Sequence, residues 1–198
     1  MHSPLRLEPV TLEGRRVRLV ALELEHVPRL AHVALDPTLW QWTLARPTDE
    51  AGLRAWAEAA IAGRDAGTEL PFVTLDAATG RPIGSSRYLN IVPEHRRLEI
   101  GWTWIAPPWQ RTGANREAKL LMLGHAFDGL GCRRVEFKTD SRNGPSRTAL
   151  LGIGAHFEGI FRNHMVMPDG RMRHSAYYSV IDDDWPGVKA RLERSLAR

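Results

Sequence analysis

The stretch from residue 98 to residue 139 constrains the fold more than any other part of the chain. LEIGWTWI at 98–105 is typical of a strand, a helical pattern covers 115–130, and RRVEFKT at 133–139 is typical of a second strand. Two strands joined through one helix are nearly always parallel, with a right-handed crossover. One face of the first strand is expected to carry Leu98, Ile100, Trp102 and Trp104. This unit predicts a parallel strand pair inside a sheet.

The remaining segments add strands and helices around this unit. Strand patterns occupy 15–22, 70–76, 83–92, 156–167 and 171–181, and helical patterns occupy 24–35, 49–64, 147–154 and the stretch from 184 onward. Pro168, Asp169 and Gly170 predict a hairpin turn between the last two strands. The order predicts an α+β fold, with one mixed, mostly antiparallel sheet around the parallel unit and helices flanking it. We expect a single domain over 1–198 with its core at about 10–186.

Composition places the chain among ordinary globular proteins. Charged residues make up 25% and hydrophobic residues 43%, which suffices for one core in 198 residues. The net charge of +4 and the pI of 9.7 mildly favour acidic partners, such as phosphorylated cofactors or nucleic acid. Cys132 is the single cysteine, so no internal disulfide can form. Because the sequence shows neither a signal-peptide pattern nor a long apolar run, we expect a soluble cytoplasmic protein without a membrane partner.

The turn QRTGAN at 110–115 has the composition of an anion-binding site. The first turn of a helix leaves backbone N–H groups without partners, and these donors attract phosphate. Gly113 lets the backbone approach a ligand without a Cβ atom in the way. The turn matches neither the G-x-x-x-x-G-K-[ST] phosphate loop nor the G-x-G-x-x-G dinucleotide fingerprint. The alternative is a solvated basic turn in front of a capped helix.

This turn resembles the Q-x-x-G-x-G/A acyl-CoA pyrophosphate motif of the GNAT superfamily of N-acetyltransferases. The segments that follow are similar to the Rim-type enzymes, which acetylate N-terminal amines of ribosomal proteins: Glu117-Ala118, HAFDGLGCRRVEFKTDSRNGPS, LGIGAHFEG, GRMRHSAYYSV and Asp184-Trp185-Pro186. The resemblance implies transfer of an acetyl group from acetyl-CoA to a primary amine by direct attack in a ternary complex. The implied acceptor is a protein N-terminus, and the alternative is a small-molecule amine such as a polyamine, an amino sugar or an antibiotic.

The same resemblance implies the cofactor contacts. Pyrophosphate contacts fall on Gln110, Arg111, Thr112, Gly113, Ala114 and Asn115. Strand-like pairing with a pantetheine amide falls on the backbone of Thr103, Trp104 and Ile105. Asn143 would contact the pantetheine arm, and the Ser146 hydroxyl would lie near the sulfur. Asn115 departs from the usual Gly or Ala, and its amide would crowd the phosphates, bind one of them or cap the helix.

Glu99 and Ser146 are the candidate catalytic residues. An attacking amine must lose a proton, and Glu99, beside the small residues Gly101 and Thr103, can accept it directly or through water. Ser146 can assist the leaving thiolate as a donor, and its alternative role is the N-cap of the next helix. The alternative for Glu99 is a solvated or ion-paired strand carboxylate. Cys132 is expected to be a buried structural thiol rather than a nucleophile.

The acceptor side is less defined by the sequence. The resemblance places acceptor-binding residues in the early helical region, where Trp40 and Trp42 would form an aromatic wall, with core packing as the alternative. The histidines show no metal-ligand spacing, so no metal is expected. A rival function is a non-catalytic module that binds acyl-CoA or nucleic acid, although no nucleic-acid motif supports a nucleic-acid partner. Segments near 160–185 would carry the contact of a homodimer, as in Rim-type relatives.

Overall fold

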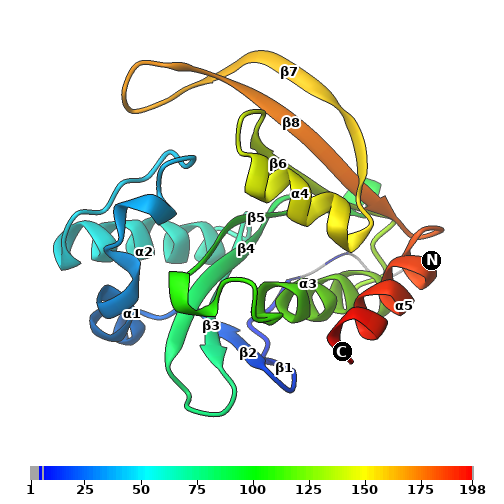
Figure 1. Ribbon diagram of the computed structural model, residues 1–198, viewed down its shortest axis with the longest axis horizontal. Helices are drawn as coiled ribbons and strands as arrows, with labels where there is room; N and C mark the ends of the chain where they lie inside the picture. Colours follow the sequence, from blue (N-terminus) through cyan, green and yellow to red (C-terminus); the bar gives the residue numbers. More distant parts are fainter. Residues whose placement is uncertain (1–4, 6, 198) are drawn as a thin grey trace.

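A computed structural model of the chain describes Leu5 and residues 7–197, and eight strands of this part form one sheet (Figure 1). The strands are β1 (Leu12–Glu13), β2 (Val17–Ala21), β3 (Leu70–Asp76), β4 (Pro82–Val92), β5 (Arg97–Ile105), β6 (Arg134–Asp140), β7 (His156–Val166) and β8 (Met172–Ile181). The helices are α1 (Val27–Ala34), α2 (Glu50–Asp65), α3 (Ala114–Gly124), α4 (Gly144–Ile153) and α5 (Trp185–Leu196). The expected domain span of 1–198 includes residues 1–4, 6 and 198, which lie outside the described residues.

The sheet has the order β1-β2-β3-β4-β5-β6-β8-β7, and its neighbours are antiparallel except for β5 and β6. These two run parallel and are joined through α3, which confirms the predicted fold class and its central unit. Their pairing is short, because 97–99 pair with 134–136 and the register ends there. Beyond Glu99, β5 stays with β4 while β6 stays with β8. The two strands therefore part into a V toward their carboxyl ends.

Two apolar clusters pack on the sheet. The first contains buried residues of α3, α4 and α5, and there the Tyr88 hydroxyl of β4 donates to the Met122 carbonyl of α3 at 2.7 Å. The second contains residues of α1 and α2, and its centre is formed by the rings of Trp40, Trp56 and Trp104. Figure 1 shows the same division, with α1 and α2 at one side of the sheet and α3 and α5 at the other. The helices therefore pack on the sheet in two separate groups.

The face predicted for β5 is wrong at Trp102 and Trp104. Trp102 has a φ of 51°, which is uncommon outside glycine, and the register with β4 shifts between Gly101 and Trp104. An extra residue in one strand forms a bulge and changes which face the later side chains occupy. Leu98 and Ile100 therefore belong to the first cluster, whereas Trp104 belongs to the second, with Trp102 packed against it. Simple alternation cannot reveal such a bulge.

The other elements follow the sequence patterns closely. Asp49 caps α2 by accepting the Gly52 N–H, and the predicted turn at 168–170 joins β7 and β8 into the long hairpin that arches over α4 (Figure 1). α4 begins at Gly144, three residues before its predicted start at 147, because Asn143 provides the cap. After Gly124 the third helix continues as a π-helical turn over His125–Gly129.

Candidate active site

Because β5 and β6 part into a V, the edge of β5 that faces β6 has no described strand as a partner beyond Glu99. Pairing with β6 ends at Glu99, and Thr103, Trp104 and Ile105 lie farther along the strand. On its other edge β5 remains paired with β4 as far as Gly84 opposite Ile105. An open strand edge can pair with an extended ligand through main-chain hydrogen bonds. The structure thus places the predicted pantetheine segment at such an edge.

The turn at 110–115 leads from this edge to the N-terminus of α3. Arg111 and Gly113 have positive φ values of 63° and 92°, and the helix begins at Ala114 without a side-chain cap. The Thr112 hydroxyl lies 3.4 Å from the Ala114 nitrogen, too far for a strong hydrogen bond. The N–H groups of the first turn and the positive end of the helix dipole are therefore available to an anion.

Glu117 holds this turn against the start of the sheet. It is 6% exposed, and its carboxylate accepts the backbone N–H groups of Arg15 (3.2 Å), Arg16 (2.6 Å) and Val17 (2.8 Å). The Arg16 guanidinium in turn donates to the Thr112 carbonyl at 3.4 Å. Sequence reasoning did not give Glu117 this role. The sequence feature that could have revealed this role is a carboxylate on the core side of the helix. A buried carboxylate needs a hydrogen-bond donor as a partner.

Asn115 and Gln110 have different environments in the turn. The Asn115 Oδ1 atom is buried and has no hydrogen-bond partner among the described residues, and Asn115 lies after the cap position, which is Gly113. Asn115 thus does not cap α3, although an amide flip would present its Nδ2 donor at the same place. Gln110 folds back on the strand, and its Nε2 atom donates to the Ile105 carbonyl at 2.9 Å.

Asn143 and Ser146 lie at the start of α4, after the other arm of the V. Asn143 is the N-cap, and its Oδ1 atom accepts the Ser146 N–H at 3.1 Å. The predicted alternative, in which Ser146 caps the helix, is therefore wrong, because Ser146 is the third residue of α4. Capping leaves the Nδ2 donor of Asn143 and the hydroxyl of Ser146 for other partners.

Glu99 lies where the two parallel strands part. Its side chain is 3% exposed, and its Oε2 atom accepts from the Asn90 amide at 2.7 Å and lies 3.4 Å from the Lys138 ammonium. Burial raises the pKa of the Glu99 carboxyl above its ordinary value, and Lys138 and Asn90 oppose that rise. A raised pKa makes a carboxylate a better proton acceptor near neutral pH. The solvated alternative for Glu99 is wrong, whereas its ion-paired alternative fits the contact with Lys138.

Lys119 of α3 is a second buried ionisable group near the bulge, and sequence reasoning missed it. Its ammonium donates to the Thr103 hydroxyl at 2.7 Å and to the Ser86 hydroxyl at 3.3 Å. Burial lowers the pKa of Lys119 to about 7. The side chain of Thr103 is therefore held by hydrogen bonds to Lys119 and Ser86.

The two predicted acceptor tryptophans have different positions. Trp40 is 1% exposed, its indole N–H donates to the Ala34 carbonyl at 2.6 Å, and its ring packs on Trp104 with centroids 5.7 Å apart. This burial fits the core-packing alternative rather than direct contact with an acceptor. Trp42 is partly exposed, and the Arg142 guanidinium lies 5.6 Å from its ring centre. Trp42 thus lies beside the loop that precedes Asn143.

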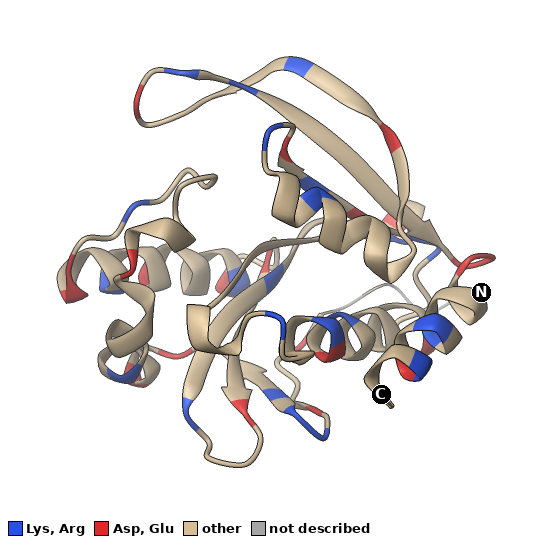
Figure 2. Ribbon diagram, in the orientation of Figure 1, with Lys and Arg blue, Asp and Glu red and all other residues tan. Residues whose placement is uncertain are grey.

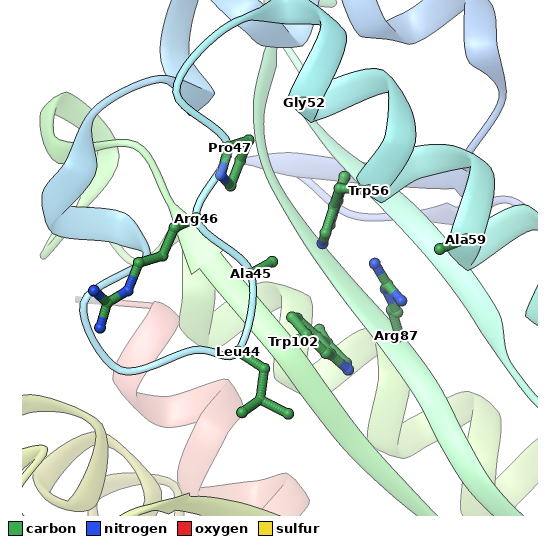
Figure 3. A pocket seen from close by; sticks show the side chains of 9 residues that line it. All are labelled: Leu44, Ala45, Arg46, Pro47, Gly52, Trp56, Ala59, Arg87 and Trp102. Carbon is green, nitrogen blue, oxygen red and sulfur yellow. The ribbon is translucent and has the colours of Figure 1, made fainter. Parts of the chain in front are cut away.

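A cavity of 360 Å³ opens beside Trp102, between α2, the preceding loop and the sheet (Figure 3). Its walls are Leu44, Ala45, Arg46, Pro47, Gly52, Trp56, Ala59, Arg87 and Trp102. The loop at 44–47 is tied to the β7–β8 hairpin, since Arg46 pairs with Asp169 at 3.0 Å. The volume is within the range of small-molecule sites, roughly 300–1,000 Å³.

Burial limits the chemistry of the single cysteine. The Cys132 thiol is 2% exposed, and burial raises its pKa to about 11, so the thiolate needed for nucleophilic attack is disfavoured. In the described part of the chain, no group of three His, Cys, Asp or Glu side chains is arranged to hold a metal ion. No described helix has both the length and the apolar character required to cross a membrane.

Comparison with known proteins identifies the family. The family model of the acetyltransferase (GNAT) domain matches residues 16–156. The chain is 25% identical over 178 residues to the uncharacterized N-acetyltransferase p20 of Bacillus licheniformis, covering 89% of this chain and 99% of p20. It is 29% identical over 99 residues to the uncharacterized N-acetyltransferase YoaA of Bacillus subtilis (strain 168), a match that covers 50% of this chain and 55% of YoaA. The chain belongs to the GNAT acetyltransferase family, and its class is therefore acyltransferase.

Solved structures agree with this assignment. A GCN5-related N-acetyltransferase from Brucella melitensis superposes with a TM-score of 0.89 at 34% identity, over 96% of this chain and 87% of that one. RimJ of Mycobacterium smegmatis, solved in complex with CoA-disulfide, superposes with a TM-score of 0.81 at 21% identity, over 94% and 95% of the two chains. The second likeness shows the shared fold alone. The resemblance to the GNAT superfamily stated from the sequence is confirmed.

Proposed function

We propose that this protein transfers the acetyl group of acetyl-CoA to a primary amine by direct attack within a ternary complex. The observation that carries the proposal is the V between β5 and β6, which ends at an uncapped helix N-terminus behind the turn 110–115. The open edge of β5 and the N-terminus of α3 together fit a ligand with amide groups at one end and a diphosphate at the other. The family membership supplies the reaction class.

The residues present fit coenzyme A. The backbone N–H groups from Arg111 to Asn115 would hold the diphosphate, and Asn115, whose Oδ1 atom has no partner among the described residues, would turn its amide donor toward it. The backbone of Thr103–Ile105 and the amide of Asn143 would hold the pantetheine arm. When bound, acetyl-CoA supplies the activated acetyl thioester.

Glu99 and Ser146 divide the proton chemistry in this proposal. Glu99, at the point where the strands part, accepts the proton of the acceptor amine through water, since its side chain is almost fully buried. The Ser146 hydroxyl donates a hydrogen bond at the sulfur end of the arm and so stabilises the leaving group. Ordering of both substrates in the V supplies much of the remaining rate enhancement.

The acceptor would enter from the side of the α1–α2 loop, where Trp42, the cavity beside Trp102 and the tip of the β7–β8 hairpin meet. A protein N-terminus is one acceptor class in our proposal. A small-molecule amine is a second class, since the cavity volume of 360 Å³ is large enough for one.

The distribution of charge gives little support to the rival function, a non-catalytic module that binds nucleic acid. Figure 2 shows basic and acidic residues interspersed along α2, α3 and α5. Binding of nucleic acid normally needs a basic stripe on one face. A homodimer remains a part of the proposal that rests on the resemblance to Rim-type enzymes. A cytoplasmic location remains a part that rests on the sequence, whose single cysteine fits a reducing compartment.

Steady-state kinetics tests the proposed mechanism. We expect intersecting initial-velocity lines when acetyl-CoA and the amine are varied together, for peptide and small-amine acceptors alike. The Cys132→Ala variant should keep a kcat within about twofold of wild type, because a buried protonated thiol takes no part in the reaction. Parallel lines, together with loss of activity in a folded Cys132→Ala protein, would contradict direct attack and indicate an acetyl-cysteine intermediate.

A further inference from the structure

Arg87 lines the cavity beside Trp102 and is almost fully buried there. It comes from the middle of β4, in the run GSSRYL, and is 4% exposed. Its guanidinium lies between two indoles, 4.8 Å from the ring centre of Trp56 and 4.9 Å from that of Trp102 (Figure 3). The two rings hold the planar guanidinium in one orientation.

The hydrogen bonds of this arginine are incomplete. Its Nη1 atom pairs with Glu69 at 2.9 Å, which is the ion pair expected for a buried charge. Its Nε and Nη2 atoms are buried and have no partner among the described residues, and the same holds for the indole N–H of Trp56. Three buried donors without an acceptor thus belong to two residues that line the cavity. Buried donors are normally paired in folded proteins, so such a cluster indicates a ligand that brings acceptors.

The charged side chains on the walls are both cationic, and each also pairs with a carboxylate outside the lining, Arg46 with Asp169 and Arg87 with Glu69. The described side chains that line the cavity include two arginines, Arg46 and Arg87, and no Asp or Glu. The other walls are apolar or aromatic, from Leu44 to Trp102. Planar bidentate recognition by arginine suits a carboxylate, and the indoles suit an apolar or flat body next to it.

We propose that this cavity binds the acceptor of the reaction, and that the acceptor is a primary amine that carries a carboxylate and an apolar body. The carboxylate pairs with Nε and Nη2 of Arg87, and the body lies along Trp56 and Trp102. Trp102 lies on the bulge of β5, three positions after Glu99, and Glu99 lies where β5 and β6 part. A ligand that packs on Trp102 therefore has its amine beside the V. This inference rests on the proposed acetyl transfer and names the substrate class of the same site.

The first test measures binding without catalysis. We would titrate 3-phenylpropionate and its neutral analogue 3-phenylpropionamide into the protein and follow tryptophan fluorescence. Hydrogen bonds to a charged group predict that the carboxylate binds about 10- to 100-fold more tightly than the amide. In Arg87→Met this preference should fall below about threefold. Equal binding of the two probes to wild type would overturn the inference, as would an unchanged preference in Arg87→Met.

Two further variants control for folding. Arg64→Met removes another arginine that pairs with a glutamate, Glu23 at 2.6 Å, but does not line the cavity, so it should keep the wild-type preference. Arg87→Lys keeps the charge and loses the planar fork, so it should keep part of the preference. Loss of the preference in Arg64→Met would overturn the assignment to Arg87. If Arg87→Met does not fold, wild type and Arg87→Lys still decide the question, because an undiminished preference in Arg87→Lys would contradict pairing by the fork.

Kinetics then separates the two sources of such an acceptor. Free amino carboxylates and their amides form one arm, and short peptides that begin with Glu or Gln form the other. A carboxylate preference in kcat/KM that Arg87→Met abolishes supports the inference, and the arm that shows it identifies the source. Absence of any preference in both arms would overturn it. Calorimetric binding of acetyl-CoA should be unchanged in Arg87→Met, so failure of acetyl-CoA binding in wild type would count against the proposed function and not against the cavity.

Discussion

The proposed cofactor side and the proposed acceptor side of this protein are built in different ways. The cofactor side is nearly continuous in sequence, since β5, the turn at 110–115, α3, β6 and the start of α4 follow one another between 97 and 146. The acceptor side combines the loop at 44–47, α2, Arg87 of β4, Trp102 of β5 and the hairpin tip at Asp169. A continuous site leaves a motif in the sequence, whereas an assembled site becomes visible only after folding.

The two sides also differ in how firmly they are held. The cofactor turn is anchored by the buried Glu117 carboxylate, which accepts three backbone N–H groups. The acceptor loop is tied to the hairpin by Arg46 and Asp169, whose side chains are 43% and 42% exposed. Exposed ion pairs contribute little to stability. We infer that the cofactor side is the rigid part of the site and that the acceptor loop can adjust to its ligand.

Replacement of Trp40 should produce the largest effect on stability while leaving the cofactor side intact. Trp40→Ala removes a buried ring that packs on Trp56 and Trp104, and we expect the free energy of unfolding to fall by about 3–5 kcal/mol. Denaturant unfolding gives this value, and calorimetry should show an unchanged affinity for acetyl-CoA in the folded variant. A stable Trp40→Ala protein that no longer binds an acceptor would instead give Trp40 a direct binding role.

Glu99→Gln tests the proton acceptor at the junction of the two sides. The amide keeps the shape of the side chain but cannot take a proton, so kcat should fall about 100-fold while the KM for acetyl-CoA changes little. In wild type, burial raises the pKa of Glu99, so activity should be lost as the pH falls through that raised value. Wild-type rates in Glu99→Gln would leave positioning alone as the source of catalysis.

Lys119→Met tests the buried lysine that supports Thr103. The folded protein loses the Lys119 proton at a pKa of about 7, whereas the unfolded chain keeps it to the ordinary value of 10.5. Between these values the unfolded state binds more protons, so raising the pH favours the folded state by about 1.4 kcal/mol per unit. The stability difference between wild type and Lys119→Met, measured by denaturant unfolding from pH 7 to 10, should show this slope. A flat difference would mean that Lys119 stays charged in the folded protein.

The smallest effect is expected at the acceptor loop. Arg46→Gln breaks the exposed ion pair with Asp169, and the free energy of unfolding should change by less than about 1 kcal/mol. Any change in kinetics should fall on the KM for the amine and spare that for acetyl-CoA. A loss of stability as large as that in Trp40→Ala would contradict the view that this loop is held weakly.

The sequence predicted the backbone of the fold well, because strand patterns, turn residues and helix caps are local signals. Asp49, the turn at 168–170 and the parallel unit are examples. The bulge at Trp102 was missed, since one extra residue in β5 depends on pairing with β4. Because that bulge moves Trp102 and Trp104 to the second cluster, the predicted face was wrong for both.

The candidate site was predicted unevenly for the same reason. Gly113, Asn143 and Glu99 stand in or beside a recognisable motif, and their roles there stay proposals. Arg87 carried a weaker signal, a single charge inside a run of small or apolar residues, and Lys119, close to the charged Arg116 and Glu117, carried none. A charge in such a run predicts burial with a special partner, but the partners lie on other elements, as Trp56 does for Arg87 and Thr103 for Lys119.

Calorimetric titration of acetyl-CoA into wild type, Gly113→Glu and Gly80→Glu tests the central claim most directly. Gly113 and Gly80 both have positive φ, 92° and 65°, so a glutamate strains the backbone in both, but Gly80 lies in the turn between β3 and β4. We expect wild type and Gly80→Glu to bind alike, and Gly113→Glu to bind about 100-fold more weakly or not at all, because its carboxylate repels the diphosphate. The proposed cofactor site at the turn 110–115 would be contradicted if wild type does not bind acetyl-CoA. It would also be contradicted if a folded Gly113→Glu protein binds acetyl-CoA as well as wild type does.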